Sequence, residues 1–255
     1  KALGAVVAID PKTGAILALV SHPAYDPNAL SSHAMGQVQK AATQLDADPN
    51  KPLINRAIGG DLYPPGSTFK IITAAAALSA GVVTDENSTV PGPAVLDLPL
   101  TTKDLANENN QPCGPNDQTT LIHALEISCN TAFASLGMQV GGDKLRAQAA
   151  KFGFGDPLRI PMRVTNSSVP ADLNAPQTAQ SAIGQYDVRV TPLQMALVAA
   201  GVANKGVVMA PYLVQEVRSS TLEVIDQASP HELSQAVTPE VAATLTKMMV
   251  SVVDN

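Results

Sequence analysis

Tyr63-Pro64-Pro65-Gly66-Ser67-Thr68-Phe69-Lys70, followed at once by the apolar run 71–80, is the stretch around which this chain is organised. Proline and glycine are unfavourable inside a helix, so residues 64–66 predict a turn and a helix that begins near Ser67. The residues that follow are apolar on nearly every side, and Gly81 is a typical helix stop. We therefore expect a helix that is buried all round.

The spacing of Ser67 and Lys70 indicates chemistry. At 3.6 residues per turn they share one helix face about one turn apart, so the amine can reach the hydroxyl. A lysine in apolar surroundings loses its proton more easily and can serve as the base for a serine nucleophile. The helix N-terminus adds positive potential where an attacked carbonyl develops negative charge. Ser-x-x-Lys also occurs by chance, so the motif is a hypothesis, which the turn and the buried helix favour.

Composition excludes several classes of protein. The 255 residues suffice for one large domain or two small ones, with 45% apolar and 15% charged residues. A net charge of -6 without a basic cluster argues against a nucleic-acid partner. No run is long enough to span a bilayer, and residues 1–6 read as a strand rather than a signal peptide, so any anchor or export signal is expected outside this chain.

Cysteine and histidine usage points to no metal or cofactor. Cys113 and Cys129 are sixteen residues apart and could pair in an oxidising compartment or remain free in the cytosol. The four histidines show no metal-ligand spacing with each other or with the cysteines.

The remaining pattern predicts a mixture of helices and strands. Strands 3–9 and 15–20 flank a tight turn and are both apolar, which predicts a hairpin buried on both faces. Thr119 and Thr191 are candidate helix caps, and Pro192 fits a first helical position. The other expected elements are helices at 37–45, 119–126, 131–137, 144–152, 191–200 and 239–253, a strand over 207–217, and loops over 21–62, 82–119 and 159–180.

Ser128 and Asn130 form a second polar cluster, 61 residues after Ser67, at the junction of two predicted helices. Ser67/Lys70 and Ser128/Asn130 together resemble the active site of the serine penicillin-recognising enzymes. That group contains penicillin-binding transpeptidases and serine β-lactamases, whose motifs are Ser-x-x-Lys, Ser-x-Asn and Lys-Thr-Gly.

The neighbouring sequence resembles class B penicillin-binding proteins over essentially the whole chain. The Pro-Cys-Gly and Ser-Cys-Asn pair is most similar to the small actinobacterial type. The segments that carry the resemblance are 8–21, Asn55-Arg56, 63–70, 128–133, Ile183-Gly184-Gln185, 190–196 and 203–206.

The resemblance implies a fold and a role for each site residue. The fold would be the α+β transpeptidase fold, an antiparallel sheet flanked by helices with an all-helical subdomain, over residues 1–255. Ser67 would be acylated, with its backbone N–H as half of the oxyanion hole, and Lys70 would be its base. Ser128 would relay a proton to the leaving amine, and Asn130 would hydrogen-bond the donor peptide. Cys113 and Cys129 would be the candidate disulfide.

One motif departs from the family pattern. No Lys-Thr-Gly follows Ser128, and the only copy, residues 12–14, precedes the nucleophile in a turn, so we reject it as the third motif. We expect the family's last strand and helix to be missing from this chain. The family uses that strand to bind the substrate carboxylate and to complete the oxyanion hole.

The choice of activity depends on an absent glutamate. A class A β-lactamase needs one after the second motif to hydrolyse the acyl-enzyme, and none occurs between Thr131 and Gln215. The remaining aspartates, Asp143, Asp156, Asp172 and Asp187, read as solvated loop or cap residues. The pattern therefore favours a long-lived acyl-enzyme.

That long-lived acyl-enzyme indicates a peptidoglycan D,D-transpeptidase inhibited by β-lactams. A penicillin sensor, a non-turnover penicillin-binding partner and a D,D-carboxypeptidase stay open as alternatives. The implied partners are stem peptides, β-lactams and other cell-wall synthesis proteins of cell shape or division. The implied location is the extracytoplasmic face of a bacterial membrane, reached through an N-terminal anchor outside this chain.

Overall fold

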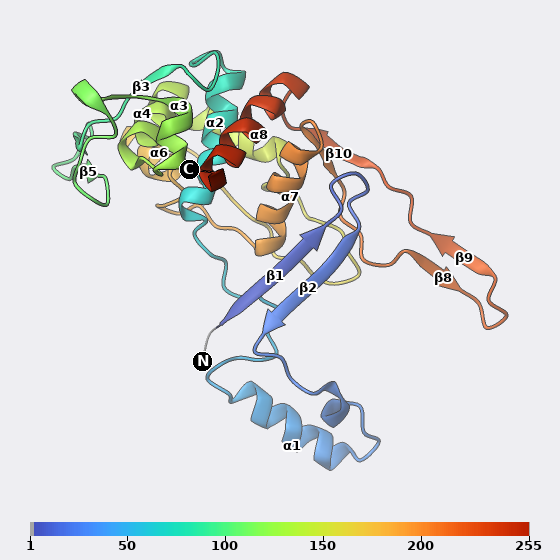
Figure 1. Ribbon diagram of the computed structural model, residues 1–255. Coiled ribbons are helices and arrows are strands. Elements are labelled where there is room, and N and C mark those ends of the chain that lie inside the picture. Colours follow the sequence, from blue (N-terminus) through green and yellow to red (C-terminus); the bar gives the residue numbers. More distant parts are fainter. Residues whose placement is uncertain (1–2, 255) are drawn as a thin grey trace.

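The computed structural model describes residues 3–254, and helix α2 (Lys70–Ser79) lies at the centre of its helical body (Figure 1). Every residue of α2 from Lys70 to Ala77 is buried, which confirms the predicted buried helix. The chain enters α2 through the 3-10 turn η2 (Gly66–Phe69), so Ser67 lies in that turn. Gly81 follows the helix with a φ of +67°, a conformation that glycine adopts without strain.

Six further helices pack on or near α2. Thr191 caps α7 by accepting a hydrogen bond from the N–H of Gln194 at 3.1 Å, which confirms the predicted start. Thr120, and not Thr119, caps α3, because the helix begins at Leu121 and Thr120 Oγ1 accepts from the N–H of His123 at 3.3 Å. The helices are α3 (Leu121–Glu126), α4 (Asn130–Val140), α5 (Gly142–Lys151), α6 (Ala175–Ala182), α7 (Pro192–Ala203) and α8 (Pro239–Asp254).

Helix α6 corrects the loop predicted over 159–180. Asn174 and Gln177 form a capping box, in which each side chain accepts from the other's backbone N–H at 3.0 Å. Pro176 stands in the first turn, where the backbone N–H has no helical partner in any case. The proline therefore marks the beginning of a helix rather than a break.

Strands β1 (Gly4–Ile9) and β2 (Ile16–His22) form the predicted antiparallel hairpin, with Val6 opposite Val20. The prediction that both faces are buried is wrong. One face packs towards Leu193 of α7, whereas Val6 and Leu17 are 61% and 70% exposed on the described structure. Apolar residues on both sides of a strand thus do not establish that two layers cover it.

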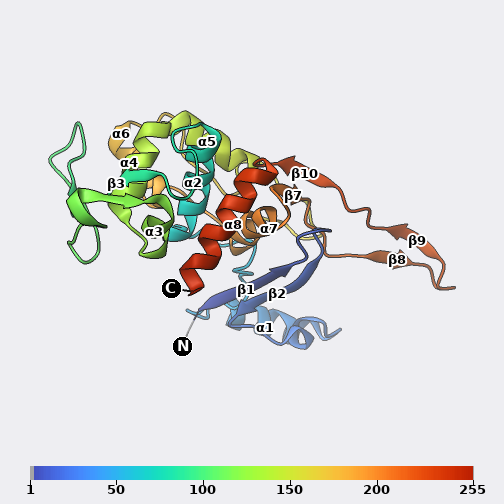
Figure 2. The same cartoon turned by 45° about the horizontal axis from the view of Figure 1, so that its top comes forward.

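The other strands form small two-stranded antiparallel ladders. The predicted strand over 207–217 divides in two, because Pro211 has no N–H to donate and interrupts it. The hairpin of strands β8 and β9 extends as an arm from the body (Figure 2). The ladders are β3 (Thr89–Pro91) with β6 (Gln118–Thr120), β4 (Val95–Leu96) with β5 (Leu105–Ala106), β7 (Val207–Met209) with β10 (Glu232–Gln235), and β8 (Glu216–Arg218) with β9 (Val224–Gln227).

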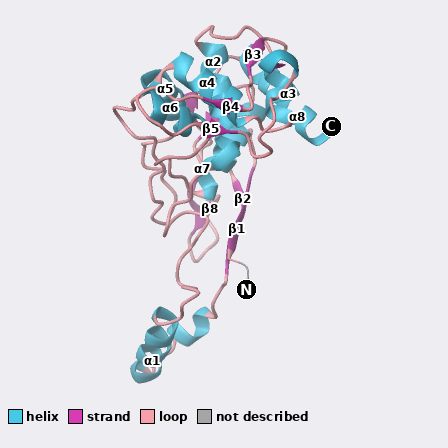
Figure 3. Ribbon diagram, turned by 90° about the vertical axis from the view of Figure 1, so that its left-hand side faces the viewer, coloured by secondary structure: helices cyan, strands magenta, loops and turns pink. Residues whose placement is uncertain are grey.

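Helix α1 (Met35–Asp46) lies apart from the body (Figure 3), and none of its residues is buried, as predicted for a surface helix. It contacts the short turn η1 (Pro27–Leu30); a third short turn, η3 (Pro115–Asp117), precedes β6. Where the chain returns from α1 to the body, the guanidinium of Arg56 donates to the backbone oxygens of Asn50 and Lys51. Within residues 3–254, no helix combines the length and the apolar character that crossing a membrane requires.

Two glycines allow close approach around the site. A Cβ on Gly137 of α4 would lie 2.2 Å from Cβ of Ala182 on α6. Gly184 has a φ of +71° and lies against the turn η2, where a Cβ on residue 184 would come within 2.1 Å of the Gly66 oxygen. The N–H of Gly66 donates to the Gly184 oxygen at 3.0 Å, so this contact fixes the position of η2.

The substitution Gly137→Ala is expected to destabilise the protein by about 1–3 kcal/mol, because the added methyl forces α4 and α6 apart. Gly36→Ala is the matched control, since a Cβ on that helical glycine of α1 meets nothing within 4 Å. The control should stabilise by up to about 1 kcal/mol through helix propensity. Denaturant unfolding measures both, and equal free energies of unfolding for the two variants would contradict this account of the packing.

Candidate active site

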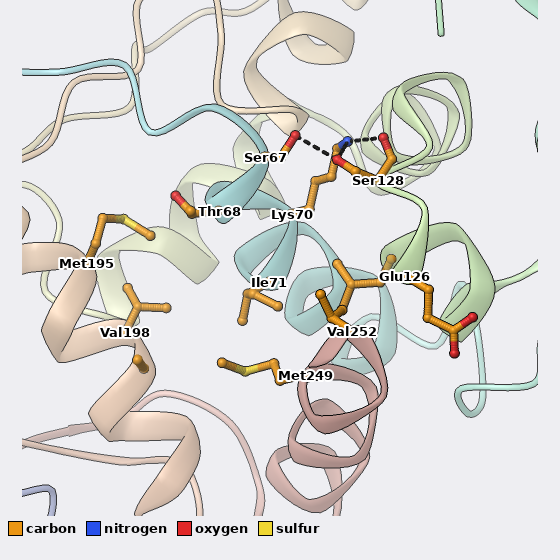
Figure 4. A pocket seen from close by; sticks show the side chains of 12 residues that line it. Ser67, Thr68, Lys70, Ile71, Glu126, Ser128, Met195, Val198, Met249 and Val252 are labelled. Atoms are coloured by element: carbon orange, nitrogen blue, oxygen red, sulfur yellow. Dashed lines mark hydrogen bonds between the residues drawn. The ribbon is translucent and has the colours of Figure 1, made fainter. Parts of the chain in front are cut away.

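Ser67, Lys70 and Ser128 meet at one end of α2 (Figure 4). Lys70 is the first residue of that helix, and its side chain is fully buried. Its Nζ donates to Ser128 Oγ at 2.9 Å, and Ser128 Oγ donates to Ser67 Oγ at 2.8 Å. Among the hydrogen bonds of residues 3–254, the predicted base thus reaches the predicted nucleophile through Ser128, and not by the direct contact that the spacing of Ser67 and Lys70 predicts.

The amine of Lys70 has three acceptors. Besides Ser128 Oγ, it donates to the Ser128 backbone oxygen at 2.7 Å and to Asn130 Oδ1 at 2.8 Å. An ammonium has three protons to give, so these contacts satisfy it completely. All four side chains that the sequence singled out for chemistry therefore lie in one hydrogen-bonded cluster.

Burial lowers the pKa of Lys70 from 10.5 to about 8, while the carboxylate of Glu108 acts in the opposite direction. Burial favours the neutral amine because the charged form loses its hydration. With a pKa near 8, about one tenth of the lysines are neutral at pH 7. That fraction is large enough for Lys70 to act as a general base near neutral pH.

The turn between α3 and α4 presents Ser128 to the lysine. Ser128 has a φ of +55°, a left-handed conformation that is costly for a residue with a side chain. Its N–H donates to the Leu125 oxygen at 3.0 Å, and the N–H of Cys129 donates to the Ala124 oxygen at 2.8 Å. Such strain is typical of functional sites whose surroundings hold the backbone in place.

A disulfide joins Cys129, in the middle of this turn, to Cys113, with their Cα atoms 6.1 Å apart. Of the two states that the sequence left open, the structure contains the paired one. The link ties the turn to the loop that carries residues 107–113. The turn is therefore held from outside as well as by its own helices.

Asn107 is a residue of this region that sequence reasoning missed. It is buried, and its Oδ1 accepts from the N–H of Thr131 at 3.1 Å. Its Nδ2 donates to the backbone oxygens of Pro93 at 3.1 Å and Gln111 at 2.9 Å. A single asparagine in a turn-rich segment gives no signal of this role, since only the fold brings its three partners together.

An open cavity of about 420 Å³ lies beside Ser67, between α2, α7 and α8 (Figure 4). Its wall is mostly apolar. The residues that line it are Ser67, Thr68, Lys70, Ile71, Leu125, Glu126, Ser128, Met195, Val198, Ala199, Met249 and Val252. A serine at the start of a helix, a buried amine and a relaying hydroxyl beside such a cavity are suited to acyl transfer through a covalent intermediate.

The other sequence candidates lie elsewhere. Residues 12–14, the only Lys-Thr-Gly, occupy the β1–β2 turn, where Thr13 Oγ1 donates to the Asp10 carboxylate at 2.9 Å. The four remaining aspartates are exposed and do not line this cavity: Asp143, Asp156, Asp172 and Asp187. Residues 3–254 contain no cluster of three side chains that could hold a metal ion.

Comparison with known proteins finds similar sequences among penicillin-binding transpeptidases. The family model described as "Penicillin binding protein transpeptidase domain" matches residues 4–255. A peptidoglycan D,D-transpeptidase, PbpA, of Mycolicibacterium smegmatis is 46% identical over 249 residues, which are 97% of this chain and 50% of that protein. Another, MrdA of Escherichia coli, is 34% identical over 89% of this chain and 36% of its own length.

A solved structure supports the fold as well. Penicillin-binding protein A of M. tuberculosis, as its penicillin G acyl-enzyme complex, superimposes with a TM-score of 0.94 at 43% identity. The match covers 98% of this chain and 57% of the solved one. The predicted fold class is thereby confirmed. The chain spans about half the length of the curated relatives that it matches.

Lys70 is expected to titrate with a pKa of about 8, below the usual lysine value of 10.5, because burial disfavours its charged form. NMR titration of protein labelled at lysine measures this, with Lys70→Met to assign the signal. The fully exposed Lys103 serves as the reference within the same sample. A Lys70 signal that moves together with the exposed lysines would contradict the proposed burial of its amine.

Proposed function

The chain belongs to the penicillin-binding protein transpeptidase family, and we propose that it forms the transpeptidase domain of a peptidoglycan D,D-transpeptidase. The observation that carries this proposal is the hydrogen-bonded path from Lys70 through Ser128 to Ser67. The donor substrate would be a stem peptide that ends in D-Ala-D-Ala. The acceptor would be an amine on a neighbouring strand of the cell wall.

The first half-reaction follows from this path. Neutral Lys70 takes a proton through Ser128, and Ser67 Oγ attacks the carbonyl of the penultimate D-Ala. Backbone N–H groups at the start of the helix stabilise the negative charge on the carbonyl oxygen. Ser128 then returns the proton to the leaving nitrogen, the C–N bond breaks, and D-Ala departs. The stem peptide remains as an ester on Ser67.

Asn130 orients the donor in this proposal. Its Oδ1 accepts a hydrogen bond from Lys70 at 2.8 Å, and this contact holds the side chain in place. The amide nitrogen Nδ2 takes no part in that hydrogen bond, so it can serve as a donor to the substrate. That nitrogen would donate to a backbone carbonyl of the stem peptide. One side chain would thus connect the position of the substrate to the position of the base.

β-Lactams would acylate Ser67 as mimics of the D-Ala-D-Ala terminus. The support is that solved relatives are named as acyl-enzyme complexes of penicillin G, imipenem and ceftriaxone. Deacylation by water would be slow, because no glutamate occurs between Thr131 and Gln215 and the four aspartates in that interval are exposed and do not line the cavity. Glu126 does line the cavity, but its carboxylate is hydrogen-bonded to His123 and Ser251. The acyl-enzyme would then persist until an amine arrives, and the protein would work on the cell-wall side of a bacterial membrane.

Treating the protein that carries this chain with penicillin G should add one penicilloyl group, on Ser67. Intact-protein mass spectrometry followed by peptide mapping measures the adduct. Ser67→Ala should abolish it, because the variant lacks the hydroxyl that attacks in this proposal, and Ser128, the other hydroxyl on the path from Lys70, serves as the proton relay. Ser219→Ala, on the exposed arm, is the matched control and should keep the adduct. No adduct on Ser67 in the wild-type protein would refute the assignment.

The rate of this acylation should rise with pH and level off above about pH 8, because only neutral Lys70 accepts a proton and its pKa is about 8. Well below that pKa the slope should approach tenfold per pH unit. Stopped-flow kinetics with a fluorescent penicillin measures the profile. Lys70→Arg, which stays charged, should lose at least about a hundredfold in rate. A flat profile between pH 6 and 9 would exclude Lys70 as the base.

A further inference from the structure

A second, smaller cavity of about 180 Å³ also borders Ser128. It is bordered by the loop 107–113 and by the α3–α4 junction, residues 127–129. Ser128 lines both this cavity and the larger one beside the nucleophile. Ser128 therefore borders two separate cavities, and only the larger one also borders Ser67 and Lys70.

The small cavity differs chemically from the large one. Glu108 is the only ionisable side chain among its described lining residues, and it is exposed. Asn109 and Gln111 add polar amide groups, and no lysine or arginine lines the cavity to neutralise the carboxylate. A negatively charged polar recess next to a proton relay is suited to a small cation.

The loop that carries Glu108 is held firmly. The N–H of Asn107 donates to the Ala94 oxygen at 3.1 Å, and its side chain spans the loop to the Gln111 oxygen at 2.9 Å. The N–H of Gln111 donates to Asn109 Oδ1 at 3.0 Å, and the disulfide fixes the loop at Cys113. These hydrogen bonds and the disulfide hold the backbone of the loop that carries Glu108 in place.

The carboxylate also acts on the reaction centre. Glu108 is the charged group that raises the pKa of Lys70 against the effect of burial. Its negative potential therefore extends to the relay, although no hydrogen bond connects it to Lys70 among the described residues. A cation bound beside Glu108 would be close to the atoms that exchange protons.

We propose that this cavity binds the acceptor amine as its ammonium, with Glu108 as the counter-ion. The proposal rests on the proposed function and specifies which side of Ser128 the second substrate uses. The donor would occupy the large cavity and be acylated onto Ser67. The acceptor would approach from the Glu108 side, so the two substrates would not compete for space.

In the second half-reaction, the bound amine replaces Ser67 on the acyl carbon. The bound ammonium gives one proton to solvent and becomes a neutral amine. Its nitrogen forms a bond to the acyl carbon, and the bond from that carbon to Ser67 Oγ breaks. The second proton lost by the nitrogen passes through Ser128 Oγ to Ser67 Oγ, which regenerates the resting serine. No further reactant is required.

Glu108 would be a specificity residue for an amine over water. An ion pair to an exposed carboxylate has a modest effect, so neutralising Glu108 should lower productive amine binding by about two- to fivefold. Water and uncharged nucleophiles gain nothing from the carboxylate. Neutralising Glu108 should therefore change how the acyl-enzyme divides between the amine and water, and should not lower the activity towards all acceptors equally.

The test uses the full-length protein with a thioester donor that acylates Ser67, at pH 7.5. The acyl-enzyme is offered D-alaninamide, which is protonated, or hydroxylamine, which is uncharged at this pH, and the ratio of aminolysis to hydrolysis is measured for each. Glu108→Gln should lower the ratio about two- to fivefold for D-alaninamide and leave the ratio for hydroxylamine unchanged. Glu108→Asp should retain part of the preference.

Asp104→Asn is the matched control, because Asp104 is also exposed on this surface and does not line the cavity. It should leave both ratios unchanged. If Glu108→Gln alters both ratios equally, or alters only the rate of acylation, Glu108 acts through Lys70 and the acceptor site is wrong. An unchanged ratio for D-alaninamide overturns it as well. If the wild-type protein forms no acyl-enzyme, the proposed function itself fails, a result separate from the other two.

Discussion

The structure depends on the burial of one amine. Lys70 begins a helix whose other residues are almost all apolar, and its side chain reaches no solvent. A buried ammonium without partners is very unfavourable, so the fold must supply acceptors at its position. The backbone oxygen and hydroxyl of Ser128 and the amide oxygen of Asn130 do so. The same contacts that stabilise the charge also connect the base to the nucleophile.

Much of the surrounding structure serves to hold those acceptors in place. The left-handed Ser128 is supported by the ends of α3 and α4, by the disulfide and by Asn107. On the opposite side, Gly184 lies directly against Gly66, which positions the turn that carries Ser67. Both reacting serines therefore lie in short, tightly supported turns at helix ends, where backbone N–H groups are also available to a developing negative charge.

The differences between the sequence predictions and the structure have a common origin. The hairpin strands β1 and β2 are apolar on both faces, yet the described structure covers one of them. The loop predicted over 159–180 instead contains α6, with Pro176 in its first turn, because Asn174 and Gln177 complete a capping box. In each case a local residue type allows two structures, and the choice depends on what packs against the segment.

The sequence by itself determined the buried helix, the Ser67/Lys70 pair at its start and the family to which the chain belongs, because helical periodicity and motif spacing are local properties. Only the tertiary structure decided that Lys70 reaches Ser67 through Ser128, that Asn107 supports the second motif, and that Glu108 borders a separate cavity. These contacts join residues up to 61 positions apart. Chain closure over such distances is set by the packing of whole helices, which no short segment encodes.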